Sequence, residues 1–361
     1  MAKLPEPFPL TIDAIYQAYV RMNDARDSTR LGASQLGKEC DRQLWYAFRW
    51  AHAPETFDGR KLRLFNTGHR EELRMLADLR NAGVGIAEYD PATGEQWTYE
   101  SLDGHLVAKL DGIGEGFAEA PASRHIIEIK THNDRSWKEV SKKGVKIAKP
   151  AHYVQVQVGM HLSGIDRAYY LAHNKNTDDL YQERIAYDPV DAGRALARAA
   201  SIIGSPVPPP KLHSDPSAKH AWQCNYCPAR GLCHGNDMPR RNCRTCLSST
   251  PVAGGFHCDV LKQVNDPNLQ KIGCSLHLYI PDLVPGEQVN ADPETRMVEY
   301  AMRDGSKFMD GGGAALPAGS GGPRTDDNGT ADAGAPNADP AFVTSVKSAG
   351  PTAPFIGEDV A

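Results

Sequence analysis

The order of apolar patterns along the chain predicts an α/β protein with a mixed central sheet flanked by helices. Three observations support this prediction. The first part of the chain spaces its apolar residues as helices do, the next part has the period of two that is typical of strands, and helical and strand patterns then alternate. This order is typical of a layered core in which helices cover a sheet.

The N-terminal part is predicted to hold three helices. The first covers residues 11–27, where apolar side chains recur at helical spacing. The second is capped by Ser34 and runs to about Trp50, because a serine oxygen accepts hydrogen bonds from the free N–H groups at a helix start. The third covers residues 61–82 and ends at Gly83, since glycine readily adopts the left-handed conformation that closes helices.

Strands are predicted wherever apolar and polar residues alternate. They cover residues 96–101, 105–111, 125–131, 166–173 and 180–186. Because turn-forming residues link the first three strands, we expect those strands to form a β-meander. Two further helices are expected, one over residues 150–163, which begin with proline, and one over residues 188–204, which end at glycine before a proline-rich run.

Composition indicates a globular protein with an acidic end. The chain has 361 residues, of which 40% are hydrophobic and 24% charged, as is usual for folded domains. From Asp310 onward there are seven acidic and two basic residues, whereas the other 38 acidic and 38 basic residues balance. No apolar run approaches the roughly 18–20 residues of a membrane span, and the N-terminus lacks the features of a signal peptide. We therefore expect a cytoplasmic protein without a membrane segment.

Asp111, in LDGIGEG, and the pair Glu128 and Lys130, in HIIEIKT, indicate a catalytic site. Glu128 and Lys130 lie at i and i+2 of a predicted strand and therefore share a face. If the strands are neighbours, Asp111 lies beside Glu128, and two adjacent carboxylates need a cation such as Mg²⁺ or Mn²⁺ between them. A lysine there can orient water or stabilise a phosphate. The flanking Ile127 and Ile129 favour a buried strand over a solvated face, the alternative interpretation.

These residues belong to a pattern that resembles the PD-(D/E)xK nucleases of the RecB and lambda-exonuclease group. Four motifs of that group occur here in the same order. They are Gly68-x-x-x-Glu72, Asp111-Gly112, Glu128-Ile129-Lys130-Thr131 and His152-x-x-Gln155-x-Gln157. The sequence departs from the group's pattern at Leu110, where proline is usual, and at His161, where an aromatic residue usually closes the glutamine motif.

The resemblance implies a restriction-endonuclease-like core and a metal-dependent deoxyribonuclease activity. Its ligands for Mg²⁺ or Mn²⁺ would be two carboxylates, a main-chain carbonyl and a helical glutamate. In this sequence these are Asp111, Glu128, Ile129 and Glu72. Glu71 and His69 are alternatives to the helical glutamate. Lys130 would serve the attacking water, and Gln155, or alternatively Gln157, would hold the water or the DNA backbone.

A lysine-rich segment, KEVSKKGVKIAKP, lies between the third and fourth motifs and is predicted to be a loop that contacts DNA phosphates. Its lysines are Lys138, Lys142, Lys143, Lys146 and Lys149. We expect the last four to bind the nucleic acid. A solvated loop with a bias in charge is the alternative interpretation.

The eight cysteines occur at short spacings, which in a reducing cytoplasm favours metal ligation over disulfides. Cys224-x2-Cys227-x5-Cys233 is one thiolate short of a complete site, and the upstream Cys40 can supply the fourth. Over residues 31–234 this arrangement resembles the CRISPR-associated RecB-like exonucleases and the AddAB-type nuclease domains. The resemblance implies a [4Fe-4S] cluster that ties the N-terminal helices to the end of the nuclease core. Zinc on the same four cysteines is the alternative.

The other four cysteines form a second set, Cys243-x2-Cys246, Cys258 and Cys274. Their spacing is typical of a zinc knuckle, and so short a segment with few large apolar residues needs a metal to hold its structure. We expect ligation by all four cysteines, with His277 in place of one of them, or free cysteines, as alternatives. Arg240, Arg241 and Arg244 around the knuckle favour a contact with DNA.

Four parts are therefore expected along the chain. They are a nuclease domain at 1–235, a zinc-knuckle module at 236–285, a linker or short helix at 286–310, and a disordered acidic tail rich in Gly, Ala and Pro at 311–361. The last residues of the tail, APFIGEDVA, are either a docking peptide or a solvated end.

The expected function is a DNA exonuclease that hydrolyses phosphodiester bonds at linear DNA ends in recombination or repair, and that is phage-encoded. The chain lacks the G-x4-GK[ST] motif of helicases, so any unwinding would come from a partner. A single-strand annealing or single-strand binding protein is the expected partner. The alternatives are a nuclease that trims DNA ends in CRISPR adaptation and a catalytically inactive DNA-binding module.

Overall fold

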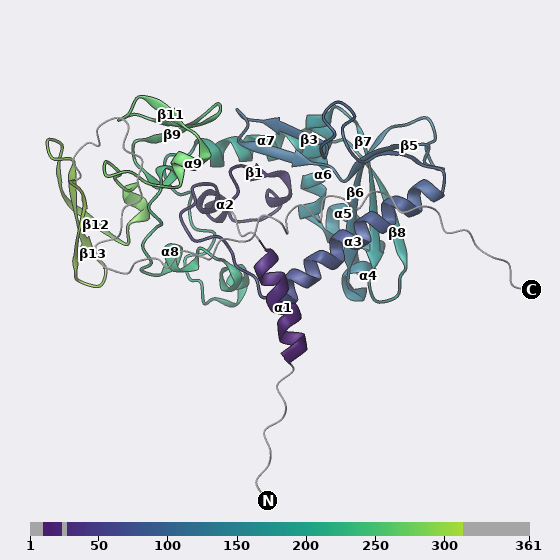
Figure 1. Cartoon of the computed structure of the whole chain (residues 1–361), viewed down its shortest axis with the longest axis horizontal. Helices are drawn as coiled ribbons and strands as arrows, with labels where there is room; N and C mark the ends of the chain where they lie inside the picture. The colour runs from purple at the N-terminus through teal and green to yellow at the C-terminus, as the bar shows by residue number, and fades with distance from the viewer. Residues whose placement is uncertain (1–9, 24–26, 313–361) are drawn as a thin grey trace, which may run out of the picture. The chain divides into compact units, whose positions relative to one another are not determined.

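The computed structural model describes residues 10–23 and 27–312 (Figure 1). Helices alternate with strands that form several sheets, so the expected mixed α/β organisation is confirmed. Among the described helices, none has both the length and the hydropathy that a membrane span requires. The predicted acidic tail falls almost wholly at residues 313–361, outside the described part of the chain.

The largest sheet has five strands in the order β2-β5-β6-β7-β8 (Figure 1). Its strands are β2 (Gly85–Ala87), β5 (Gly112–Glu115), β6 (His125–His132), β7 (Arg167–Asn174) and β8 (Leu180–Ala186). β6 and β7 are parallel, whereas every other neighbouring pair is antiparallel. A parallel pair needs a crossover connection. Here the crossover consists of α4 (Asp134–Lys143), α5 (Val145–Ala148) and α6 (Pro150–Ser163).

Helices pack on both faces of this sheet. α3 (Gly59–Asn81) packs on one face, where Met75 lies in one apolar cluster with Ile127. α4, α5 and α6 pack on the other face, where Val156 lies in one cluster with Ile126. Because both faces are covered, any charged residue in the middle of β6 is held inside the protein and needs a partner.

A second sheet, with the order β1-β4-β3, corrects the predicted β-meander. Its strands are β1 (Leu31–Gly32), β4 (Leu106–Lys109) and β3 (Thr98–Ser101). β4 pairs with β1 and β3 and not with β6, whose neighbours are β5 and β7. The strand expected at 105–111 is shorter than predicted. The N–H of Leu110 still donates a hydrogen bond to the carbonyl of Trp97, but the chain then leaves this sheet, and β5 begins at Gly112.

The N-terminal helices differ from the prediction in their caps. They are α1 (Leu10–Met22), the 3-10 turn η1 (Ala33–Gln35), α2 (Asp41–Phe48) and α3. Ser34 lies inside η1 and does not cap a helix. Cys40 is the N-cap of α2, because its Sγ accepts a hydrogen bond from the N–H of Gln43 at 3.4 Å. The helix expected at residues 188–204 is present as α7 (Pro189–Gly204), with Asp188 as its N-cap.

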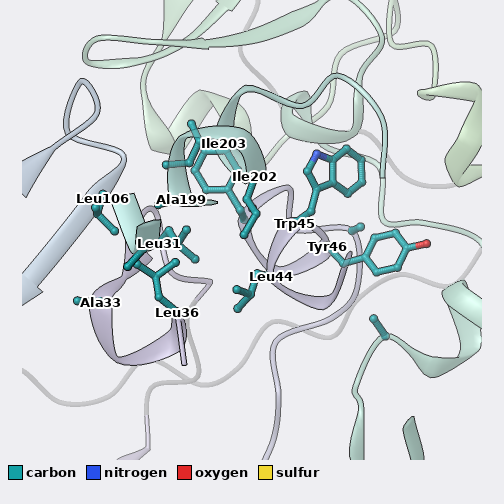
Figure 2. Packing of buried hydrophobic residues seen from close by; sticks show 14 of the residues in the cluster. Leu31, Ala33, Leu36, Leu44, Trp45, Tyr46, Leu106, Ala199, Ile202 and Ile203 are labelled. Atoms are coloured by element: carbon teal, nitrogen blue, oxygen red, sulfur yellow. The ribbon is translucent and has the colours of Figure 1, made fainter. Parts of the chain in front are cut away.

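One apolar cluster joins elements from both ends of the described chain. Figure 2 shows its centre, where Leu44, Trp45 and Tyr46 of α2 pack near Ile202 and Ile203 of α7. The same cluster includes three residues from the C-terminal region, Phe256, Ile280 and Leu283. The region expected to be a separate zinc-knuckle module therefore shares a core with the helices of the predicted nuclease domain.

The C-terminal region consists of short elements. They are η2 (Lys219–Tyr226), α8 (Arg230–His234), η3 (Cys243–Thr245), β9 (Ser249–Val252), β10 (Gly255–Cys258), β11 (Gln263–Asn265), α9 (Pro267–Gln270) and η4 (Pro281–Leu283). The strands form one antiparallel sheet with β10 in the middle.

The prediction of a linker or short helix at 286–310 is wrong. This segment forms an antiparallel sheet of β12 (Gly286–Asp292), β13 (Met297–Met302) and β14 (Lys307–Gly311). Arg296 and Gly305 have positive φ angles of 54° and 85°, which let the chain turn back between strands. Tyr300 is buried and its ring packs near Phe308, so the sheet has a small apolar centre of its own.

Candidate active site

Asp111 lies at the junction between β4 and β5, where the chain passes from one sheet to the other. Its Oδ2 accepts a hydrogen bond from the main-chain N–H of Ile129 at 2.8 Å. This bond holds the carboxylate beside β6. Burial raises the pKa of Asp111, while the Lys130 ammonium and the Ile129 N–H act in the opposite direction.

Glu128 and Lys130 lie two residues apart on β6, and Lys130 Nζ forms an ion pair with Oε1 of Glu128. Glu128 is only 2% exposed. Burial raises its pKa to about 7, with Lys130 opposing this effect and Asp111 adding to it. Burial alone would lower the pKa of Lys130, but its attraction to Glu128 and Asp111 raises it. Lys130 therefore keeps its positive charge at neutral pH.

Glu72, on α3, completes the group of carboxylates. Partial burial and the neighbouring Asp111 raise its pKa to about 7, and Lys130 lowers it. The adjacent Glu71 lies elsewhere, with Oε2 at 3.1 Å from Arg74 Nη1 and 3.7 Å from His173 Nδ1. α3 therefore brings Glu72, and not Glu71, to Asp111 and Lys130. His69, the other alternative, is on the exposed side, with its Nδ1 3.9 Å from Glu72.

The two glutamines of α6 have different surroundings. Gln155 donates a hydrogen bond from Nε2 to Oε2 of Glu128 at 3.0 Å. Gln157 is fully buried, where it donates to the carbonyl of Ala186 at 2.9 Å and accepts from the N–H of Asp188 at 2.8 Å. Gln155 is thus the residue next to the carboxylates, and Gln157 joins α6 to the segment that precedes α7.

A buried polar network beside Glu128 was not found from the sequence. Tyr170 pairs with Glu128 across β6 and β7. Its hydroxyl lies 3.0 Å from Nε2 of His132 and 2.8 Å from Nδ1 of His152, and Nδ1 of His132 lies 2.9 Å from Oγ of Ser136. Burial, aided by the nearby lysines, lowers the pKa of His132 to about 4 and that of His152 to about 3, so both are neutral at pH 7. The network joins α4, α6 and both central strands.

An open pocket of about 400 Å³ lies where α3 meets the end of β6. It is lined by Leu64, Phe65, Thr67, Gly68, His69, Glu72, Ile129, Lys130, Thr131 and Lys175. Asp111 accepts a hydrogen bond from the N–H of Ile129 and Glu128 pairs with Lys130, so both carboxylates lie next to residues of its wall. Of the sequence-predicted residues of the catalytic site, Glu72, Ile129 and Lys130 thus line the pocket, and the others lie beside them.

The lysine-rich segment is helical, which corrects the predicted loop. It forms α4 and α5, which cover the sheet. Several of its lysines pair with acidic residues of the protein: Lys138 Nζ lies 2.8 Å from Asp134, and Lys143 Nζ lies 2.9 Å from Glu139. Lys146 Nζ similarly lies 2.8 Å from Asp191. Contact of Lys143 and Lys146 with DNA would have to replace these pairs.

The first set of cysteines is assembled from distant parts of the chain. Cys40, Cys224, Cys227 and Cys233 all line one narrow pocket of about 20 Å³. Burial, with smaller effects from the three other thiols of the set, raises the pKa of Cys227 to about 11. His234 lies at the edge of the group, with Nε2 4.0 Å from Sγ of Cys224. Four thiols that face one pocket form a donor set suited to an iron–sulfur cluster or to zinc.

The second set of cysteines also gathers in one place. Burial raises the pKa of Cys243 to about 11, and Cys274, Cys246 and Cys258 add to this effect. His277 is buried with Nε2 3.3 Å from Oγ1 of Thr245, and burial lowers its pKa to about 3. The four thiols therefore lie near one another, while His277 contacts a threonine.

The arginines around the second set have structural contacts, and the burial of Arg244 corrects the expectation that this residue contacts DNA. Arg244 is 1% exposed, lies 3.8 Å from the centre of the Trp50 ring, and donates to the carbonyls of Phe48 and Thr29 at 2.8 and 2.9 Å. A buried guanidinium cannot reach a nucleic acid. Arg240 pairs with Asp27 at 2.9 Å, and Arg241 donates to the carbonyl of Cys274 at 3.0 Å.

Metal ligation remains a prediction for all three groups. Within residues 10–23 and 27–312, no three His, Cys, Asp or Glu side chains already have the arrangement of a metal site. The chemistry of the donors nevertheless fits the expected ions, because Asp111, Glu128 and Glu72 offer the oxygen ligands that Mg²⁺ and Mn²⁺ prefer, and each cysteine set offers four sulfurs.

Comparisons with known proteins give low similarity. No family model matches the chain, and no curated protein matches it. Among similar solved structures, the crystal structure of SSO0001 has 15% identity and a TM-score of 0.36, over 62% of this chain and 96% of that one. Two crystal structures of the alkaline exonuclease LHK-Exo from Laribacter hongkongensis, one in complex with dAMP, have 13% identity and TM-scores of 0.35, over 52% of this chain and 89% of theirs. Similarity at this level does not establish a family or an activity.

Proposed function

We propose that the protein is a metal-dependent DNA exonuclease that hydrolyses phosphodiester bonds at linear DNA ends, and that it serves recombination or repair. The observation that supports this most strongly is that four residues meet beside one pocket, which Glu72 and Lys130 line. Asp111 comes from the β4–β5 junction, Glu128 and Lys130 come from β6, and Glu72 comes from α3. Carboxylates beside a positively charged lysine are the groups that hydrolysis of an anionic phosphate ester requires.

Each of these side chains has a role that follows from its position. Asp111, Glu128 and Glu72, with the main-chain carbonyl of Ile129, would hold Mg²⁺ or Mn²⁺, whose charge would stabilise the negative charge that builds up on the phosphate. Gln155 fixes the orientation of Glu128 through their hydrogen bond. Lys130 orients the attacking water and neutralises charge on the phosphate oxygens.

The proposed reaction is a hydrolysis. The oxygen of a water bonds to phosphorus, and the P–O bond to the neighbouring nucleotide breaks. One proton of the water passes to solvent, and the leaving oxygen takes up a proton. No oxidant, reductant or nucleotide triphosphate is consumed.

We also propose structural metals at the cysteine sets. Cys40, Cys224, Cys227 and Cys233 would hold a [4Fe-4S] cluster, and Cys243, Cys246, Cys258 and Cys274 would hold Zn²⁺. What supports this is that each set gathers in one place, and that the first set does so although Cys40 is remote in sequence from the other three. Binding free energy at such sites adds directly to folding free energy.

The test of the nuclease is a time course on end-labelled linear DNA and closed circular DNA with Mg²⁺ or Mn²⁺. We expect release of nucleotides from the linear substrate alone, and no release when the metal is chelated. Asp111→Ala and Lys130→Ala should each reduce the rate by about 100-fold or more, which is typical for the loss of one group that stabilises transition-state charge. Glu72→Gln should also reduce the rate.

Glu71→Gln is the matched control, because Glu71 neighbours Glu72 on α3 but contacts Arg74 and His173 instead. It should retain activity. Equal activity of wild type, Asp111→Ala and Lys130→Ala would refute the nuclease assignment. DNA binding without cleavage by the wild type would instead favour a DNA-binding module.

A further inference from the structure

The N-terminal half of α3 forms one wall of the active-site pocket and has a marked bias in charge. Residues 59–70 contain four basic side chains and no acidic one. The basic residues are Arg60, Lys61, Arg63 and Arg70. The following residues, 71–81, contain three acidic and two basic ones. A positive potential is therefore concentrated at the part of the helix that precedes Glu72.

Large apolar side chains are exposed in the same half of the helix. Leu64 is 49% exposed and Phe65 is 42% exposed, and both line the pocket. The ring of Phe65 contacts Phe57 edge to face, with 5.1 Å between the ring centres. Lys61 Nζ lies 4.3 Å from the centre of the Phe57 ring and 6.0 Å from that of Phe65. Phe57 and Lys61 thus hold Phe65 in place while much of its ring surface stays accessible.

The pocket extends along α3 from Phe65 to Glu72, both of which line it. Phe65, Gly68 and Glu72 follow one another at helical spacing on one face of α3. A Cβ atom at Gly68 would have only Oγ1 of Thr131 within 4 Å, at 3.7 Å, so no side chain separates Phe65 from Glu72 at this point. Seven residues of helix span about 10 Å, or about three stacked nucleotides at roughly 3.4 Å each.

We propose that Phe65 stacks on an unpaired nucleobase of the substrate strand, about three nucleotides or fewer from the phosphate that is cleaved, and that the basic residues of 59–70 contact the backbone of that strand. This inference rests on the proposed function, because it places DNA in the same pocket. Proteins bind single-stranded nucleic acid with aromatic rings that stack on the bases and cations that contact the backbone. Inside a duplex both faces of a base are already stacked, so the site selects single-stranded or frayed ends.

The charge around the pocket favours a DNA strand over an apolar protein partner as the bound molecule. An apolar helix or strand would cover Leu64 and Phe65 but would supply no counter-charge to the basic side chains of residues 59–70, of which Lys61 has an acidic neighbour in Glu55 at 3.8 Å. A DNA strand supplies a base for the aromatic ring and phosphates for the cations. Lys130 and Lys175, which also line the pocket, add positive charge along the same path.

The experiment measures binding of a labelled single-stranded oligonucleotide to the whole chain by fluorescence anisotropy, in chelator, so that no hydrolysis occurs. A matched oligonucleotide carries abasic sites at its end. We expect wild type to bind the intact strand about 5- to 100-fold more tightly than the abasic strand, the range that one base–aromatic stack provides. Phe65→Ala should remove this difference, whereas Phe65→Trp should keep it.

Leu73→Ala is the matched control, because Leu73 is 57% exposed on the same helix but does not line the pocket. It should bind as wild type does. Phe65→Leu keeps an apolar side chain without a ring and should lose the preference for the intact strand. This variant tests the role of the ring even if Phe65→Ala is unstable. Equal affinity of wild type for both strands, or an equal loss in Leu73→Ala, overturns the inference.

The two proposals can fail separately. A protein that prefers the intact strand through Phe65 but releases no nucleotides with Mg²⁺ or Mn²⁺ retains the stacking site and is not a nuclease. A protein that degrades intact and abasic strands equally well, with the same rates in Phe65→Ala, is a nuclease without the stacking site.

Discussion

At the residue scale, burial decides the charge of each group near the pocket. Glu128 and Glu72 have pKa values raised to about 7, because desolvation and the neighbouring Asp111 both disfavour their anions. Lys130 stays charged because these carboxylates surround it. Without a bound cation, Lys130 does not fully offset the negative charges of the three carboxylates, which repel one another. A divalent ion would relieve this repulsion.

This imbalance predicts how stability depends on pH. The pKa of Glu128 is raised from 4.5 to about 7 on folding, so between these values the folded protein binds a proton that the unfolded chain has released. This proton binding stabilises the folded protein; its contribution is complete below pH 4.5 and is lost as pH rises through 7. In metal-free protein at pH 8, Glu128→Gln should therefore increase the free energy of unfolding, by on the order of 1 kcal/mol.

Urea unfolding in chelator at a series of pH values checks this expectation. The wild type should lose stability relative to Glu128→Gln as pH increases from 5 to 8. Added Mg²⁺ should stabilise the wild type at pH 8 more than the variant, because ligand binding to the folded state adds to stability. Parallel pH profiles of the two proteins would contradict the raised pKa.

At the scale of elements, the approach of α6 to β6 determines whether Gln155 reaches Glu128. Gly159 lies one turn after Gln155 and faces the sheet, where a Cβ atom would meet Leu110 at 3.1 Å and Ile126 at 3.2 Å. The missing side chain lets the helix pack closely on the sheet. The hydrogen bond between α6 and the carboxylate thus depends on a small residue elsewhere in the helix.

We predict that Gly159→Val pushes α6 away from the sheet. Overpacking of this kind usually costs about 1–3 kcal/mol of stability, and it should reduce nuclease activity as the Gln155–Glu128 hydrogen bond lengthens. Gly193→Val on α7 is the control, since a Cβ there meets nothing within 4 Å and the position is exposed. Thermal unfolding temperatures and nuclease rates of both variants test this prediction. Equal losses at the two glycines would show that helix propensity, and not packing against the sheet, causes the loss.

The elements that the sequence predicted well are those with strong local signals. α6 begins at a proline and α7 ends at a glycine, and both have the expected bounds to within one residue. The β-meander was wrong because alternation identifies strands but not their partners, and the chain passes from one sheet to the other between Lys109 and Gly112. The sheet at 286–311 was missed although its second turn contains Asp304-Gly305, a strong hairpin signal; its first turn places Arg296 at positive φ, which is uncommon for a residue other than glycine.

The candidate site was predictable in part for a similar reason. The spacing of Glu128 and Lys130 on one strand is a local feature, and their ion pair follows from it. The contact of Tyr170 with His132 and His152 depends on the register of two strands and a helix, which no local pattern specifies. The burial of Arg244 depends on tertiary packing against Trp50, so its charge alone was misleading.

At the scale of the whole molecule, the N-terminal helices and the C-terminal region depend on each other. Arg49 of the α2 C-cap is 2% exposed and donates to the carbonyls of Ser205, Arg244 and Ser249. Arg244 in turn donates to the carbonyl of Phe48. The first cysteine set joins the same two regions at Cys40. The cysteine metals would therefore stabilise the whole molecule and not a detachable module.

This organisation predicts separate effects of the two cysteine sets. Protein purified without oxygen should be brown and contain about four irons per chain. Cys40→Ser should lose the iron, keep zinc, and unfold at a lower temperature, whereas Cys243→Ser should lose zinc and keep iron. Metal analysis with thermal unfolding of both variants provides the measurement. A colourless protein with two zinc ions, one of which is lost in Cys40→Ser, would show zinc at both sets.

The buried pair of arginines also has a consequence for protein synthesis. The ribosome makes Asp111, Glu128 and Gln155 well before Arg244 and Ser249, the residues whose carbonyls complete the surroundings of Arg49. A nascent chain, or a product of premature termination, therefore carries all the residues of the candidate site but lacks the packing that secures α2. A chain that ends before Arg244 should therefore hold α2 less firmly than the whole protein does.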